Sequence, residues 1–136
     1  MESINLEKLL LEKDQLPINI SSLSKEDEFG INLVSLNENY RREYEPESPS
    51  YLERLNILKE FSSNGFKTFI NLDNYPAPNK IHQDFNEILD TISFVDKIIL
   101  NKNSLNGIGK YKKFYEDLET MIINFCNNNY IKYSIV

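Results

Sequence analysis

Four short apolar segments alternate with stretches of helical periodicity, and this alternation limits what the chain can fold into more than any other feature. The segments are residues 29–36, 66–72, 94–100 and 131–136, all rich in branched and aromatic residues, as buried strands are. Strands that alternate with helices pair in parallel through right-handed crossovers. The sequence therefore predicts an α/β fold with a sheet of about four mainly parallel strands and helices packed against it.

The helices are expected where apolar residues recur at helical spacing, at residues 4–13, after Ser48, at 82–93 and at 111–127. Ser48 followed by Pro49 is a start signal for the second of these helices, and Gly65 is a stop signal. Residues 16–20 could form a brief extended piece. The stripe expected to be buried on the second helix consists of Tyr51, Leu52, Leu55, Leu58 and Phe61.

A chain of 136 residues is one domain by length. We divide it into residues 1–28, an N-terminal helix and connection, and residues 29–136, the β/α domain. No apolar run approaches the roughly 18 residues of a membrane span, and the N-terminus does not begin like a signal peptide. A cytoplasmic protein without a membrane contact is expected.

The formal net charge of −6 argues against direct contact with nucleic acid, because a surface that follows phosphates needs clustered lysine and arginine. An acidic protein of this size could instead occupy a basic surface on a protein partner. The alternative is that the charge serves solubility alone.

Few residues offer catalytic or metal chemistry. The single cysteine, Cys126, excludes an all-cysteine metal site, and the single histidine, His82, excludes a multi-histidine one. Ser35 lacks the surroundings of a serine nucleophile. Glu45 and Asp73 could form an acid/base pair, but solvated carboxylates are the simpler interpretation. The balance is against an enzyme, with no catalytic residue and no metal site.

Ligands of parallel sheets bind beyond the carboxyl ends of the strands, where the loops 36–48, 73–80 and 101–110 are expected to meet. The free edges of a small sheet offer a second kind of contact, to a protein partner or to another copy of the chain. The candidate partner-binding residues of the acidic loop face are Tyr40, Arg41, Glu43, Tyr44, Glu45, Glu47, Asp73, Asn74, Tyr75 and Asn79.

Several pieces in order resemble the C-terminal half of a radical SAM protein. They are residues 29–36, Tyr44-Glu45-Pro46, Glu53-Arg54-Leu55 with Gly65-Phe66-Lys67-Thr68, Tyr75-Pro76-Ala77-Pro78-Asn79 and residues 93–99. The resemblance covers the chain from Phe29 onward and implies a truncated (β/α) half-barrel, an alternative to the open sheet.

The same resemblance shows what the chain lacks. The CxxxCxxC loop that binds an iron–sulfur cluster in that family is missing, and one cysteine cannot supply three thiolates. Asp73-Asn74 and Asn101-Lys102 stand where Glu-Pro and Gly-Arg would be expected. No cofactor is expected, and S-adenosylmethionine is the one that the resemblance leaves open.

We therefore interpret the chain as a non-catalytic interaction protein on a truncated radical-SAM-like scaffold. One form of this hypothesis is an acidic inhibitor of a nucleic-acid enzyme, as anti-CRISPR proteins are. The alternatives are a residual domain that binds S-adenosylmethionine or a nucleotide, the detached half of a split radical SAM enzyme, and a gene remnant.

Overall fold

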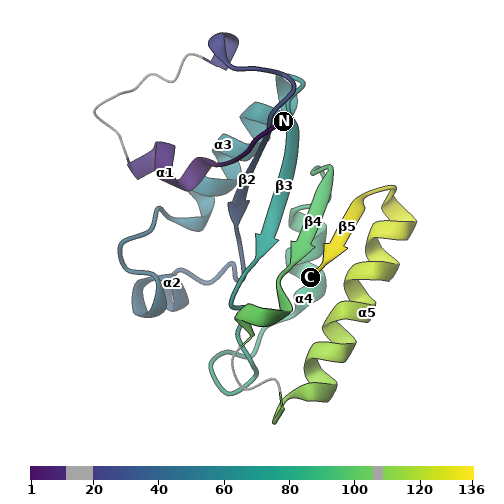
Figure 1. Cartoon of the computed structure of the whole chain (residues 1–136). Coiled ribbons are helices and arrows are strands. Elements are labelled where there is room, and N and C mark those ends of the chain that lie inside the picture. The colour runs from purple at the N-terminus through teal and green to yellow at the C-terminus, as the bar shows by residue number, and fades with distance from the viewer. Residues whose placement is uncertain (12–19, 106–108) are drawn as a thin grey trace.

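The computed structural model describes residues 1–11, 20–105 and 109–136, and its centre is one parallel sheet (Figure 1). Five strands follow one another across the sheet in the order of the chain, and all neighbouring pairs are parallel. The α/β class with parallel pairing is therefore confirmed. The strands are β1 (Ser3–Asn5), β2 (Glu28–Asn32), β3 (Lys67–Leu72), β4 (Lys97–Leu100) and β5 (Lys132–Ile135).

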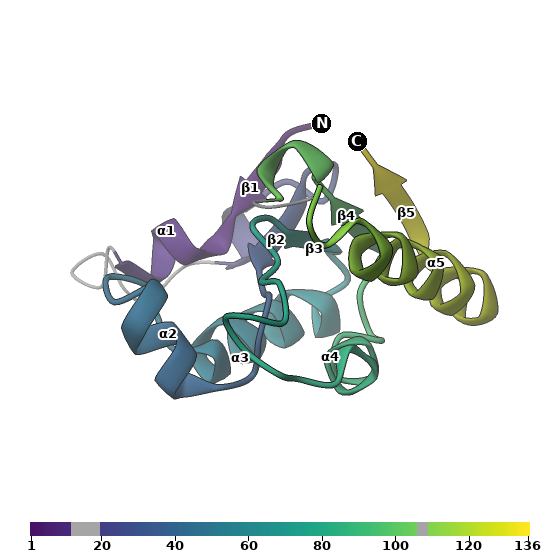
Figure 2. The ribbon, with the colours of Figure 1, turned by 90° about the horizontal axis from the view of Figure 1, so that it is seen from below.

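The α-helices α3, α4 and α5 lie on the same face of this sheet (Figure 2). This follows from the strand order, because right-handed crossovers that always step in one direction place every connecting helix on one side. A segment of a (β/α) barrel has the same arrangement. The described α-helices are α1 (Leu6–Leu11), α2 (Glu38–Tyr44), α3 (Tyr51–Ser63), α4 (Phe85–Thr91) and α5 (Lys112–Asn129).

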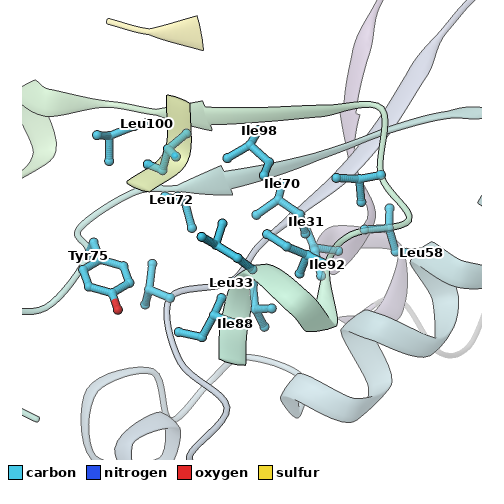
Figure 3. Close-up of a cluster of buried hydrophobic side chains, with 14 of the residues drawn as sticks. Ile31, Leu33, Leu58, Ile70, Leu72, Tyr75, Ile88, Ile92, Ile98 and Leu100 are labelled. Carbon is cyan, nitrogen blue, oxygen red and sulfur yellow. The ribbon is translucent and has the colours of Figure 1, made fainter. Parts of the chain in front are cut away.

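The register of the strands separates two faces of the sheet. Ile31, Ile70, Ile98 and Tyr133 stand in one row across β2 to β5, and the three isoleucines are fully buried against the helices. Figure 3 shows this layer, with Leu58 of α3 and side chains of α4 beneath the strands. Burial of this apolar layer is the main stabilising contribution to the fold.

The opposite face carries the alternate residues of each strand and is polar at its rim. Its middle row runs from Gly30 through Phe69 and Lys97 to Lys132. Phe69 is buried here because its ring lies over Gly30, where an added Cβ would stand 2.3 Å from the ring. Glycine is therefore required at position 30 by a close approach.

Strand β1 is the largest departure from the predicted fold. Residues 4–13 were expected to be helical, but Ser3–Asn5 pair with β2 and the helix α1 begins at Leu6, while residues 12 and 13 lie outside the described residues. The hydroxyl of Ser3 donates a 2.6 Å hydrogen bond to Oε1 of Glu28, which fixes this short strand at the edge. Of the extended piece expected at 16–20, residues 16–19 lie outside the described residues, and Ile20 begins a 3-10 turn.

The predicted start of helix α3 was wrong by two residues. The N-cap is Ser50, whose hydroxyl accepts a hydrogen bond from Glu53 N at 3.1 Å. In return, the Glu53 carboxylate accepts a hydrogen bond from the backbone N–H of Ser50. This capping box outweighs the Ser48-Pro49 signal. Leu52, expected in the buried stripe, is 67% exposed because the box turns that position toward solvent. The predicted end is confirmed, since Gly65 has a φ of 84°.

Candidate functional site

The carboxyl end of strand β2 is the most strongly charged part of the interior. Arg54 of helix α3 is fully buried there, and its guanidinium contacts four groups. It donates to the carbonyls of Pro49 (3.0 Å) and Asn32 (2.8 Å) and to Oε1 of Glu45 (3.0 Å). Oε1 of Glu7 lies 3.5 Å away from Nη1. One buried cation thus joins α1, β2, α3 and the segment after α2.

Glu7 and Glu45 hold this arginine from two sides. Oε1 of Glu7 also accepts a 2.6 Å hydrogen bond from the backbone of Asn32, so α1 is tied directly to the end of β2. Burial raises the pKa of Glu7, although Arg54 and the Asn32 N–H oppose this effect. The carboxylates of Glu45 and Asp73 add repulsion that raises the pKa of Glu7 further.

Tyr51 completes the network on the side of α3. Its hydroxyl donates a 2.6 Å hydrogen bond to Oε2 of Glu45, and its ring lies 4.9 Å from the guanidinium carbon of Arg54. Burial and this hydrogen bond raise the pKa of Tyr51, so the residue is a fixed donor. Both carboxylate oxygens of Glu45 are therefore engaged by the protein, and the side chain is held in one orientation.

Beside this network lies a pocket of about 330 Å³, formed by helix α2, the segment after β2 and the loop after β3. Its position beyond the carboxyl ends of parallel strands is where such sheets bind ligands. The pocket brings together half of the residues predicted for the acidic loop face. These are Tyr40, Tyr44, Glu45, Asp73 and Asn74.

Helix α2 explains why the two tyrosines face this pocket. Residues 37–47 were predicted to be a loop, but Asn37 accepts hydrogen bonds from the backbone of Asn39 and Tyr40 and starts a short helix. Tyr40 and Tyr44 are one turn apart, and their ring centroids are 4.6 Å from each other. Residues four apart share a helix face, so the rings form one aromatic surface.

The other predicted residues lie elsewhere. Tyr75 is buried in the core, where its hydroxyl accepts a hydrogen bond from Gln83 and its carbonyl accepts one from Tyr115. Arg41 is turned inward, donating to Glu38 and to the Ser48 carbonyl at 2.8 Å each. The residues of this set that stay exposed outside the pocket are Glu43, Glu47 and Asn79. The acidic loop face is thus smaller than expected.

Sequence reasoning missed six members of the network and the pocket: Glu7, Asn32, Val34, Tyr51, Arg54 and Lys80. Asn32 forms part of the pocket wall, and its side-chain oxygen accepts a 2.9 Å hydrogen bond from Asp73 N. Lys80, also in the wall, places its ammonium 5.4 Å from the ring centroid of Tyr44. Arg54 carried a readable signal, because it stands on the apolar stripe of α3 between Tyr51 and Leu58. A charge in that position needs buried partners.

Within the residues that the structure describes, no cluster of three or more histidine, cysteine or carboxylate side chains could hold a metal ion. Cys126 is buried on α5, and burial raises the pKa of its thiol to about 11. No helix in the described ranges is long and apolar enough to cross a membrane.

Comparison of the chain with protein-family models, with curated proteins and with solved structures found no match. The resemblance to radical SAM proteins therefore stays a prediction from the sequence.

Proposed function

We propose that this chain is a non-catalytic interaction protein that binds a basic protein partner through the free edge of strand β5. The observation that carries the proposal is the position of β5. In the described part of the chain it pairs with β4 and has no strand on its other side. A free edge presents unpaired N–H and C=O groups that can bind a further strand.

The direction of the backbone hydrogen bonds supports this edge as the contact. Lys132 N donates to Asp96 O and Val136 N donates to Leu100 O, both at 3.0 Å. Because successive N–H groups of a strand point to opposite sides, those of Tyr133 and Ile135 point away from β4. An incoming strand would accept hydrogen bonds from these two groups.

Exposed apolar side chains flank the same edge. Tyr130 is 98% exposed, Tyr133 is 41% exposed and Val136 is 60% exposed. Strand β1, at the other edge of the sheet, is shorter and pairs over three residues. A partner strand along β5 would gain both backbone hydrogen bonds and apolar contact area.

The net charge of −6 favours a basic partner over a second copy of the chain, because two copies repel each other. Enzymes that act on nucleic acids carry basic surfaces. The narrower form of the proposal is therefore an inhibitor of a bacterial defence nuclease, of the anti-CRISPR kind. Such a protein would act in the cytoplasm and would not contact nucleic acid itself.

Two substitutions at one position test the edge. Tyr133→Pro removes the outward N–H and keeps the hydrogen bonds to β4, whereas Tyr133→Ala removes the side chain and keeps the N–H. The measurement is binding to, and inhibition of, purified RNA-guided nucleases at physiological salt. We expect Tyr133→Pro to abolish binding and Tyr133→Ala to weaken it. Binding that Tyr133→Pro leaves unchanged would contradict the edge, and no inhibition by the natural chain would contradict the nuclease form.

A second candidate is the detached half of a split (β/α) barrel. It is favoured by the sequential strand order with α3, α4 and α5 on one face, which is the arrangement of a barrel segment with two free edges. Co-expression with a separately encoded half that carries a CxxxCxxC loop tests it. A one-to-one complex is expected, and two halves that elute separately would contradict it.

A further inference from the structure

The pocket beside helix α2 carries an unbalanced negative charge. Of its two carboxylates, Glu45 is bound by Arg54 and Tyr51. The carboxylate of Asp73 has no hydrogen bond and no ion pair with any residue that the structure describes. Behind the wall Glu7 adds a third carboxyl group, so three carboxyl groups stand against two cations, the guanidinium of Arg54 and the ammonium of Lys80. A cationic ligand would neutralise the charge of Asp73, which pairs with none of the described residues.

Tyr40 gives a second, independent indication of a ligand. The residue is only 8% exposed, yet its hydroxyl has no hydrogen-bond partner among the described residues. No fully buried side-chain nitrogen or oxygen lacks a partner among the described residues, so this hydroxyl keeps some solvent access, and Tyr40 is part of the pocket wall. Burial and the nearby Glu45 raise the pKa of Tyr40 to about 12, so the hydroxyl stays protonated and can both donate and accept.

The ring of Tyr44 already attracts a cation. The ammonium group of Lys80 lies 5.4 Å from its centroid, within the range of a cation–π contact. Lys80 is exposed, and its side chain lies in the wall of the pocket. The protein's own lysine therefore occupies a position that a ligand ammonium could take.

We propose that this pocket binds a small organic ammonium ion, with a linear polyamine as the ligand class. Asp73 would pair with one ammonium group, the Tyr40 hydroxyl would accept a hydrogen bond from it, and the Tyr44 ring would contact the alkyl chain or a second ammonium. The volume of about 330 Å³ lies at the lower end of the range for small-molecule sites, as a molecule of this size requires.

In this arrangement Lys80 is a built-in competitor. When the pocket is empty, its ammonium group covers the ring of Tyr44. A bound amine displaces it, because two ammonium groups on one ring repel each other. The site is separate from the edge of β5, so the proposal stands or falls independently of the proposed function.

Titration calorimetry of the full chain with spermidine tests the proposal. Putrescine is the shorter amine, 1,4-butanediol is its uncharged analogue and succinate is an anion of similar length. We expect saturable one-to-one binding of spermidine and no binding of the diol or of succinate. No heat with either amine, or equal binding of the diol, would overturn the proposal.

Three variants separate the site from nonspecific attraction to an acidic surface. Asp73→Asn should weaken spermidine binding by about tenfold or more, since it removes the charged acceptor. Asp90→Asn removes the same charge from an exposed position on α4 and should leave the affinity unchanged. Lys80→Met should tighten binding, because it removes the competitor.

Equal losses from Asp73→Asn and Asp90→Asn, or weaker binding by Lys80→Met, would overturn the site. Tyr40→Phe keeps the ring and removes a hydroxyl that has no partner among the described residues, so it tests the site even if Asp73→Asn does not fold. It should weaken spermidine binding several-fold, and unchanged affinity would equally count against the site.

Discussion

Arg54 on helix α3 donates a hydrogen bond of 3.0 Å from Nη2 to Oε1 of Glu45, at the end of α2. The arginine is fully buried, and the same guanidinium lies 3.5 Å from the carboxylate of Glu7 on α1. Three helices and the end of β2 thus depend on one cation. A buried charge is tolerated only with such partners.

Replacing Arg54 by methionine should lower the free energy of unfolding by about 3–5 kcal/mol, because two carboxylates lose their buried partner. Denaturation by urea at neutral pH measures this. Lys112→Met is the matched control, since Lys112 forms an exposed ion pair with Glu116 at 3.9 Å and should contribute little. Equal losses in the two variants would show that the network does not stabilise the fold.

Gly30→Ala should also destabilise the protein, since the new Cβ would stand 2.3 Å from the ring of Phe69. We expect a loss of about 1–3 kcal/mol, as for overpacked cores. Thermal unfolding of Gly30→Ala, Phe69→Leu and the double variant gives the coupling free energy between the two positions. The double variant should recover part of the stability that Gly30→Ala loses. Gly109→Ala, with no atom within 4 Å of the added Cβ, is the control. Strictly additive effects of Gly30→Ala and Phe69→Leu would contradict this packing.

The start of helix α3 can be tested with two serines. Ser50→Ala removes the N-cap hydroxyl that binds Glu53 N and should cost about 1 kcal/mol of stability. Ser48→Ala should be close to neutral, because its contacts to Arg41 and Glu45 are made by the backbone. Chemical denaturation measures the loss of stability in both variants. A larger loss in Ser48→Ala than in Ser50→Ala would support the helix start predicted at Ser48.

The raised pKa of Glu7 predicts a dependence of stability on pH. The folded carboxyl group holds its proton to a higher pH than the unfolded one, whose pKa is 4.5. In the range just above pH 4.5 the folded state thus binds more protons, and the Glu7 contribution falls as pH rises. Glu7→Gln should remove this component from the pH profile of unfolding.

Glu28 gives the opposite sign and serves as the comparison. Burial of Glu28 raises its pKa, but the hydrogen bonds from Ser3 and Lys97 and the charge of Lys97 outweigh this effect, so the pKa is lowered. The stability it contributes is lost as pH falls below 4.5. Glu28→Gln should therefore reduce the fall in the free energy of unfolding below pH 4.5. Identical profiles for Glu7→Gln and Glu28→Gln would contradict both assignments.

Long periodic patterns in the sequence predicted most of the fold, whereas short or polar elements were not predicted. β3, β4 and α5 follow from sustained apolar patterns of the kind that parallel sheets bury. Strand β1 has three residues and forms through contacts that no local pattern carries, whereas the seven-residue helix α2 starts at the N-cap Asn37, a local signal in a segment that was interpreted as a loop. Ser3 is fixed by Glu28, which lies 25 residues away in the chain.

The candidate site was predicted only in part for the same reason. Tyr40, Tyr44 and Asp73 were found because loops after parallel strands meet at one edge of the sheet. Glu7 was missed because it joins the site through Arg54 and the backbone of Asn32, contacts that depend on tertiary structure. Tyr75 was taken for a surface residue because the prolines around it indicate a loop, yet the structure buries its side chain.

Site-specific photo-crosslinking in the source cells shows whether the edge of β5 binds a basic protein. A photoreactive phenylalanine analogue replaces Tyr133 on the edge of β5 or, as the control, Leu52 on the exposed side of α3. We expect an adduct with a basic protein from position 133 and none from position 52. No adduct from position 133, equal adducts from both positions, or an adduct of twice the mass of the chain alone would contradict this expectation.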